Sequence, residues 1–201
     1  MNVLLVQGTW GDDDTWWRRS QVYPDGNGTF ADAVVAAGHT LVNGRPFEWS
    51  TDLGGVGFGN RDLNTWKGAG RHLYDYCDPP RVGLGPIPNL CIIGHSHARQ
   101  VIKYACSFGL AAETVLLVSG PIRKDVDRET TEARTHIGRL ICYHGGAQDR
   151  MQWFGELFDG VVGVKRHDPE ADDNRRIKSA SHSTLLRDPA FYHLVLADIY
   201  P

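Results

Sequence analysis

The sequence predicts an α/β protein of three layers, in which helices cover both faces of a mostly parallel sheet of about six strands. Two observations lead to this fold class. Short apolar runs rich in β-branched residues recur along the chain, and they are continuous rather than alternating, as in strands buried on both faces. Stretches of helical character separate most of these runs, which is the pattern of crossover helices that join parallel strands.

The order of elements follows from these runs and from the turn residues between them. Six strands are expected at residues 3–6, 40–42, 90–93, 114–118, 139–143 and 160–165. Helices are expected at residues 28–38, 60–76, 97–109, 128–135, 147–158 and 189–199. Glycine and proline collect in residues 52–59 and 78–88, which are expected to be loops, as is the charged stretch 168–180.

Length and charge limit the class of protein. The 201 residues are enough for one domain with a continuous core, and no long polar linker or internal repeat divides them, so we expect a single domain over residues 1–201. Lysine and arginine number 21 and the acidic residues 24, for a net charge of -3 with both signs mixed. This balance argues against nucleic acid as the main partner. The sequence carries no indication of oligomeric state.

The four cysteines are far apart, with no C-x-x-C pair, and are expected to be reduced thiols. The first ten residues do not resemble a signal peptide, and no apolar run approaches the roughly 20 residues needed to span a bilayer. These features together predict a cytoplasmic protein without an integral membrane segment.

The strongest motif is Gly94-His95-Ser96-His97-Ala98, which follows a predicted buried strand and opens a predicted helix. In a G-x-S-x-G nucleophile elbow, the serine lies on a tight turn from strand to helix, so the residues two before and two after it must be small. Gly94 and Ala98 meet this requirement. The turn would expose the Ser96 hydroxyl at the carboxyl end of the sheet, where the helix also directs its first N–H groups.

With this elbow, the chain resembles the α/β-hydrolase superfamily, and in particular its small lipase- and esterase-like serine hydrolases. Ala98 replaces the usual final glycine. The strand end Gln7-Gly8-Thr9 is similar to the H-G-x segment of these enzymes, with Gln7 in place of histidine. The resemblance implies an oxyanion hole formed by the backbone amides of Thr9 and His97. The Trp16-Trp17 pair, residues 47–50 and Arg61 extend the similarity along the chain.

The order of residues in this superfamily is nucleophile, acid and then histidine. Carried over to this chain, that order implies a triad of Ser96, Asp149 and His182. The implied activity is hydrolysis of an ester, with an amide or thioester as the less favoured substrate, through an acyl-enzyme on Ser96. The substrate would be a small-molecule or lipid-like ester, no cofactor or metal is implied, and the short chain implies a minimal fold without a large cap domain.

Several alternatives remain open. Asp125 or Asp127 would be the acid if it followed the preceding strand, although Pro121, Arg123 and Asp125 are expected to form a turn with an ion pair. His167 is the main rival of His182, whereas His193 is expected to pack within a helix. Five tryptophans would line either an acyl-binding cleft or the core: Trp10, Trp16, Trp17, Trp66 and Trp153. Trp10, Trp17 and Trp153 are the candidates for substrate binding.

Two other classes of function also remain. One is a metal-dependent hydrolase that uses His95 and His97, although the residues around this pair do not follow the usual metal-binding motifs. The other is a non-catalytic binding module on a hydrolase scaffold, because a fold does not determine a function.

Overall fold

A computed structural model describes residues 1–8, 16–17, 28–49, 63–77, 86–145, 167–178 and 185–199. The elements, in chain order, are β1 (Asn2–Val6), α1 (Phe30–Ala36), β2 (Thr40–Leu41), η2 (Val42–Gly44), α2 (Leu63–Cys77), β3 (Leu90–His95), α3 (Ala98–Ser107), β4 (Ala112–Val118), α4 (Lys124–Glu129), η3 (Thr131–His136), β5 (Ile137–His144), β6 (Asp173–Arg176), η5 (Leu185–Arg187) and α6 (Pro189–Ile199). None of the helices among these residues is long and apolar enough to cross a membrane.

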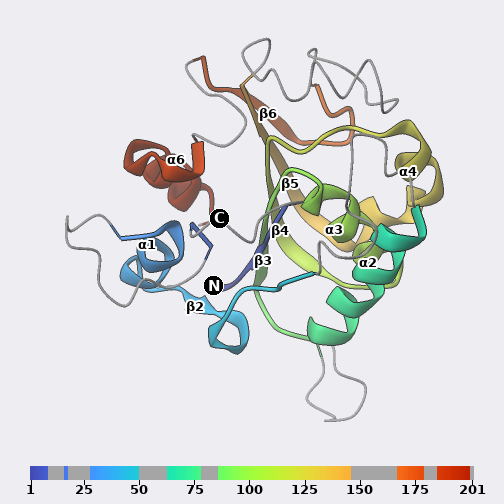
Figure 1. Ribbon diagram of the computed structural model, residues 1–201, viewed down its shortest axis with the longest axis horizontal. Helices are drawn as coiled ribbons and strands as arrows, with labels where there is room; N and C mark the ends of the chain where they lie inside the picture. The colour runs from blue at the N-terminus through green and yellow to red at the C-terminus, as the bar shows by residue number, and fades with distance from the viewer. Residues whose placement is uncertain are drawn as a thin grey trace.

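The strands form one sheet in the order β2-β1-β3-β4-β5-β6, and every neighbouring pair is parallel (Figure 1). The prediction of a parallel sheet of about six strands is therefore confirmed. The chain builds outward from β1 in two directions, with β2 on one side and β3 on the other. In open sheets of this kind, the crevice outside the carboxyl ends of the strands at such a switch point is the usual ligand site.

Two hydrophobic clusters lie on the two faces of the sheet, because successive side chains of a strand point to opposite faces. Leu4 and Val6 of β1 pack in the cluster that includes residues of α2 and α3. Val3 and Leu5 pack in the other cluster, with residues of α1 and α6. Figure 1 shows the same division, with α1 and α6 on one side of the sheet and α2 and α3 on the other. This arrangement confirms the predicted three layers.

Helix α1 begins at Phe30, two residues after the predicted start, because Thr29 caps it. The Asp32 amide donates to the Thr29 side chain at 3.2 Å, and the Thr29 amide donates to the Asp32 carboxylate at 3.1 Å. This reciprocal capping box satisfies amides that a helix start leaves without an intrahelical acceptor.

The second half of the chain differs from the prediction in two places. The helix expected at residues 128–135 is instead α4, which ends at Glu129, followed by the 3-10 helix η3. The charged stretch expected to be a loop contains the strand β6, because a strand at the edge of the sheet pairs through its backbone and needs few apolar side chains. The strand and helix expected at residues 160–165 and 147–158 lie outside the described residues.

The four cysteines form no disulfide, as the sequence predicts. All four cysteines are buried free thiols, and burial raises the pKa of Cys91 and of Cys106 to about 12.

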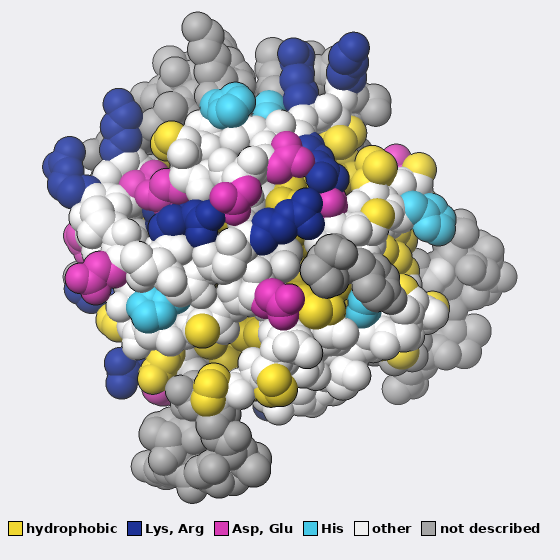
Figure 2. Space-filling view, turned by 180° about the vertical axis from the view of Figure 1, so that it is seen from behind, with side chains coloured by type: hydrophobic (Ala, Val, Ile, Leu, Met, Phe, Trp, Pro, Cys, Tyr) yellow, Lys and Arg dark blue, Asp and Glu magenta, His cyan; other side chains and the backbone are white. Residues whose placement is uncertain are grey.

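In Figure 2, acidic and basic side chains lie next to one another across the middle of the face shown. The mixing of signs seen along the sequence therefore also holds on this face of the molecule.

Candidate active site

Ser96 lies immediately after β3, a strand in the middle of the sheet, and therefore at the edge where the carboxyl ends of the strands lie. Its φ of 54° places it in the left-handed region, which a residue other than glycine rarely adopts. The Ser96 amide donates to the carbonyl of Val118 at 2.9 Å, so the turn is tied to the neighbouring strand β4. This geometry is the strained strand-to-helix turn that the motif predicts.

The small residues on either side of the turn are needed for packing. A side chain at Gly94 would bring its Cβ within 2.4 Å of Ile102 Cδ1 and 3.1 Å of Ala98 Cβ, and Ala98 is itself fully buried. The strand and the following helix thus approach one another closely at this point. A Cβ at Gly94 would require the Ile102 side chain to shift and Ala98 to move slightly.

Helix α3 begins at Ala98, two residues after Ser96. His97 is its N-cap residue, and the Arg99 amide donates to the Ser96 carbonyl at 3.2 Å. The first amides of a helix carry a partial positive charge and have no acceptor within the helix. The start of α3 therefore supplies a field that would stabilise an anion formed next to Ser96.

The end of β1 packs against the same turn. A Cβ at Gly8 would lie 2.9 Å from both the His95 carbonyl oxygen and Ser96 Cβ, so this contact requires glycine. Gln7 fixes the strand end through two hydrogen bonds to Trp49. Its side-chain amide donates to the Trp49 carbonyl at 2.5 Å, and the Trp49 indole donates to the Gln7 carbonyl at 2.7 Å. Gln7 thereby supports the segment that leads to Thr9, which lies outside the described residues.

The two histidines of the elbow contact different aromatic rings. His95 lies edge-on to Trp16 with ring centroids 6.2 Å apart, and His97 lies 5.3 Å from Trp66. Trp16 belongs to the cluster on the α1 and α6 face, whereas Trp66 belongs to the cluster on the α2 and α3 face. The two imidazoles therefore diverge instead of forming a metal-binding pair. Within the described parts of the chain, no group of three or more His, Cys, Asp or Glu residues is arranged to hold a metal ion.

The described residues include only part of the predicted site. Ser96 and His97 lie together at the end of β3. Trp17 is fully buried in the cluster on the α1 face, which is the core position that the sequence left open as an alternative to substrate binding. The other predicted site residues lie outside the described residues: Thr9, Trp10, Asp149, Trp153 and His182.

The rival acids after β4 are engaged in ion pairs. Arg123 donates to Asp125 through Nη2 at 2.6 Å and Nε at 3.1 Å, which confirms the expected pair. The hydrogen bonds from Arg123 are the main cause of the lowered pKa of Asp125. Asp127 accepts from Arg99 at 2.8 Å and from Lys103 at 2.7 Å.

The rival histidines are both exposed. His167 is exposed and precedes β6 in the chain. His193 lies within α6 as predicted, but it is exposed rather than packed, because α6 turns its other side chains, among them Phe191 and Val195, toward the core.

A buried charged cluster next to the elbow was not predicted. Arg99 and Lys103 are one helical turn apart on α3 and are almost fully buried, with Asp168 paired to Arg99 and Glu170 to Lys103. The sequence does contain a signal for this cluster. Two cations lie at i, i+4 in a helix that packs on the sheet, and acidic residues occur in the later charged stretch.

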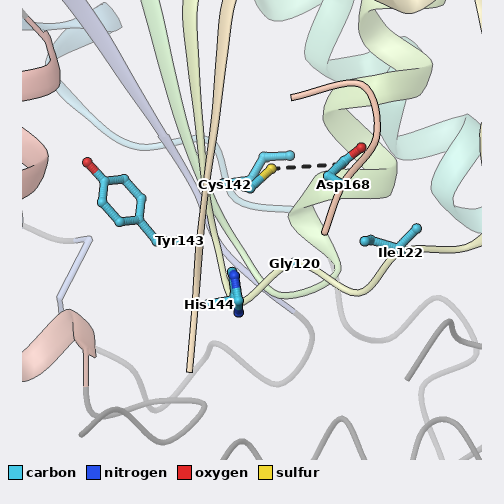
Figure 3. A pocket seen from close by; sticks show the side chains of 7 residues that line it. Gly120, Ile122, Cys142, Tyr143, His144 and Asp168 are labelled. Carbon is cyan, nitrogen blue, oxygen red and sulfur yellow. Dashed lines mark hydrogen bonds between the residues drawn. The ribbon is translucent and has the colours of Figure 1, made fainter. Parts of the chain in front are cut away.

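Asp168 also lines a small cavity at the carboxyl ends of β4 and β5 (Figure 3). The cavity volume is about 10 Å³, which is room for a single water molecule and not for a substrate. Figure 3 shows Cys142 pointing toward Asp168, with Tyr143 on the opposite side of the sheet. The other lining residues are Leu117, Gly120, Ile122 and His144.

Comparisons with known proteins place the fold in a broad class. No protein-family model and no curated protein matches the sequence. Among solved structures, the chain is similar to acetyl xylan esterase 1 from Thermoanaerobacterium sp. JW/SL YS485, with a TM-score of 0.51 and 12% sequence identity. The similarity covers 100% of this chain and 75% of that protein. At this level of identity the match shows a shared α/β fold, and the esterase activity is that of the other protein.

Proposed function

We propose that this protein is a serine hydrolase that cleaves ester bonds through an acyl-enzyme on Ser96. The observation that carries the proposal is the left-handed conformation of Ser96 at the end of the central strand β3, directly before helix α3. A serine in this position lies directly before a helix start, which is the arrangement of a nucleophile elbow. The similarity of fold to an acetyl xylan esterase is consistent with this activity.

In the proposed mechanism, the Ser96 hydroxyl attacks the ester carbonyl while His182 accepts its proton. Asp149 holds the imidazole of His182 in the required tautomer and stabilises its protonated form. His182 then returns the proton to the leaving alcohol, and a water molecule activated in the same way hydrolyses the acyl-enzyme. The backbone amides of Thr9 and His97 would bind the oxyanion, an interaction whose loss costs about 3 to 4 kcal/mol of transition-state stabilisation.

The proposed site draws on residues from both halves of the chain, so we propose that residues 1–201 act as one domain. The order of the strands supports the assignment, because β1 and β3, which lead to Thr9 and Ser96, are neighbours at the switch point of the sheet. The substrate is proposed to be a small-molecule or lipid-like ester, and the mechanism needs no cofactor.

Turnover of a p-nitrophenyl ester tests the proposal. We expect turnover that is insensitive to a chelator, with an initial burst of p-nitrophenol when deacylation limits the rate. Rapid loss of activity with the chelator would instead support a metal-dependent hydrolase. No turnover across a panel of acyl chain lengths would support a binding module on this scaffold.

A further inference from the structure

Asp168 stands at the meeting point of three elements. Arg99 of α3 donates to a single oxygen of the Asp168 carboxylate, through Nε at 3.0 Å and Nη2 at 2.8 Å. The Cys142 thiol of β5 lies 3.8 Å from the same oxygen. Asn174 of β6 clamps the Asp168 backbone, because its side chain accepts from the Asp168 amide at 2.9 Å and donates to the Asp168 carbonyl at 3.0 Å.

These three elements are the ones that lead to the proposed triad. Helix α3 starts just after Ser96, β5 ends shortly before Asp149, and β6 ends shortly before His182. Asp168 therefore contacts the nucleophile helix and β5 through its carboxylate, and β6 through its backbone. Each of the three triad positions depends on the placement of one of these elements.

The Arg99–Asp168 pair is buried, and Arg99 has a second acidic partner. The side chains of Arg99 and Asp168 are 1% and 2% exposed, and the third nitrogen of the guanidinium donates to Asp127 at 2.8 Å. Lys103 extends the cluster by bridging Asp127 and Glu170. Burial by itself would raise the pKa of Asp168, but the charge of Arg99 and its hydrogen bonds outweigh this effect and lower the pKa. The pair is thus held in its ionised form.

A buried ion pair adds little stability relative to apolar residues of similar volume, because both charges lose their hydration. Such a pair does fix one geometry, since a planar guanidinium binds a carboxylate in few orientations. Relying on the function proposed above, we propose that Arg99 and Asp168 are positioning residues that hold β5 and β6, the strands from which the acid and the base follow, in register with the Ser96 elbow.

The test separates positioning from stability with an apolar replacement of both charges. In Arg99→Met/Asp168→Leu no charge is left unpaired, so we expect the melting temperature to stay within a few degrees of that of the wild type. With a p-nitrophenyl ester, we expect kcat to fall at least about tenfold with KM changed less than about twofold. We also expect the midpoint of the pH profile of kcat/KM to shift, because β6, from which the base follows, would no longer be held in place.

Arg99→Lys is the second variant, in case the double variant does not fold. It keeps the positive charge but loses the planar guanidinium, so we expect an intermediate kcat and partial restoration of the pH profile. The matched control is Arg71→Gln/Asp75→Asn, which removes an exposed i, i+4 ion pair of α2. Because Arg71 also lies over the Tyr74 and Phe108 rings, the melting temperature should fall by no more than a few degrees, and the kinetics should be unchanged.

The outcomes are distinct. If the folded double variant, or folded Arg99→Lys, had the kcat and pH profile of the wild type, the pair would be purely structural and the positioning role would be wrong. If the wild type itself neither turned over an ester nor reacted with a fluorophosphonate at Ser96, the proposed function would be wrong.

Discussion

The strands β3 and β4 are neighbours in the sheet and end in almost the same way. Each is followed by a serine in the left-handed region, with φ of 54° at Ser96 and 51° at Ser119. Each serine donates its amide to the adjacent strand, Ser96 to Val118 at 2.9 Å and Ser119 to Tyr143 at 2.8 Å. The backbone turn alone therefore does not distinguish the proposed nucleophile.

The residues after the turn make the difference. After Ser96, helix α3 begins at Ala98, whereas α4 does not begin until Lys124, well after Ser119. Ser119 is also completely buried, while Ser96 keeps 7% of its surface exposed. A helix start next to the hydroxyl supplies amide donors and a favourable field, and of these two strand ends β3 has one and β4 does not. A left-handed turn at a strand end is therefore a nucleophile elbow only where a helix begins directly after it.

Replacing the two serines in turn gives the largest expected effect. Ser96→Ala should lower kcat/KM for a p-nitrophenyl ester by about 10⁴-fold or more, because the nucleophile is lost. Ser119→Ala has the same backbone turn and should keep activity within about threefold. Equal loss in both variants, measured on folded protein, would mean that Ser96 has no special role.

The second prediction compares two acids, Asp149 after β5 and Asp125 after β4. Asp149→Asn should lower kcat by roughly 10³- to 10⁴-fold, because His182 would no longer be held in the correct tautomer. Asp125→Asn should change kcat less than about threefold, since Asp125 is paired with Arg123. The reverse result in steady-state kinetics would assign the acid to the strand before β5.

The third prediction concerns the contact between the end of β1 and the Ser96 elbow. Gly8→Ala would place a methyl group 2.9 Å from Ser96 Cβ and the His95 carbonyl, so we expect kcat to fall by about 10- to 100-fold. The matched glycine is Gly68 in α2, where no atom lies within 4 Å of an added Cβ. Gly68→Ala should leave kcat unchanged and raise the free energy of unfolding by about 0.5 to 1 kcal/mol. Full activity in Gly8→Ala would show that the two strand ends are not coupled.

The dependence of stability on pH is the smallest expected effect. The pKa of Asp168 is lower in the folded protein than the value of about 3.9 expected in the unfolded chain. Its contribution to stability is therefore present above pH 4 and is lost as the pH falls through the folded pKa. Urea unfolding between pH 5 and 3 should show this loss, with a shallower slope in Asp168→Asn. An identical slope in the two proteins would mean that the pair is not ionised.

The sequence predicted the centre of the molecule better than its edge. Buried strands such as β1 and β3 are recognisable because both of their faces are apolar, and the small residues around Ser96 indicate the turn directly. The edge strand β6 was missed because its charged side chains carry no such pattern. The Arg99–Asp168 pair joins residues far apart in the chain, so the spacing of Arg99 and Lys103 can indicate a cationic helix face but not the partner of Arg99. The roles of Asp149 and His182 remain predictions from residue order.

Covalent labelling with a fluorophosphonate, followed by mass spectrometry of the intact protein and its peptides, tests directly whether Ser96 is the nucleophile. We expect a single adduct on the peptide that contains Ser96, absent in Ser96→Ala and retained in Ser119→Ala. A folded wild-type protein that takes up no label, or that is labelled on another residue, would contradict the assignment of Ser96 as the nucleophile.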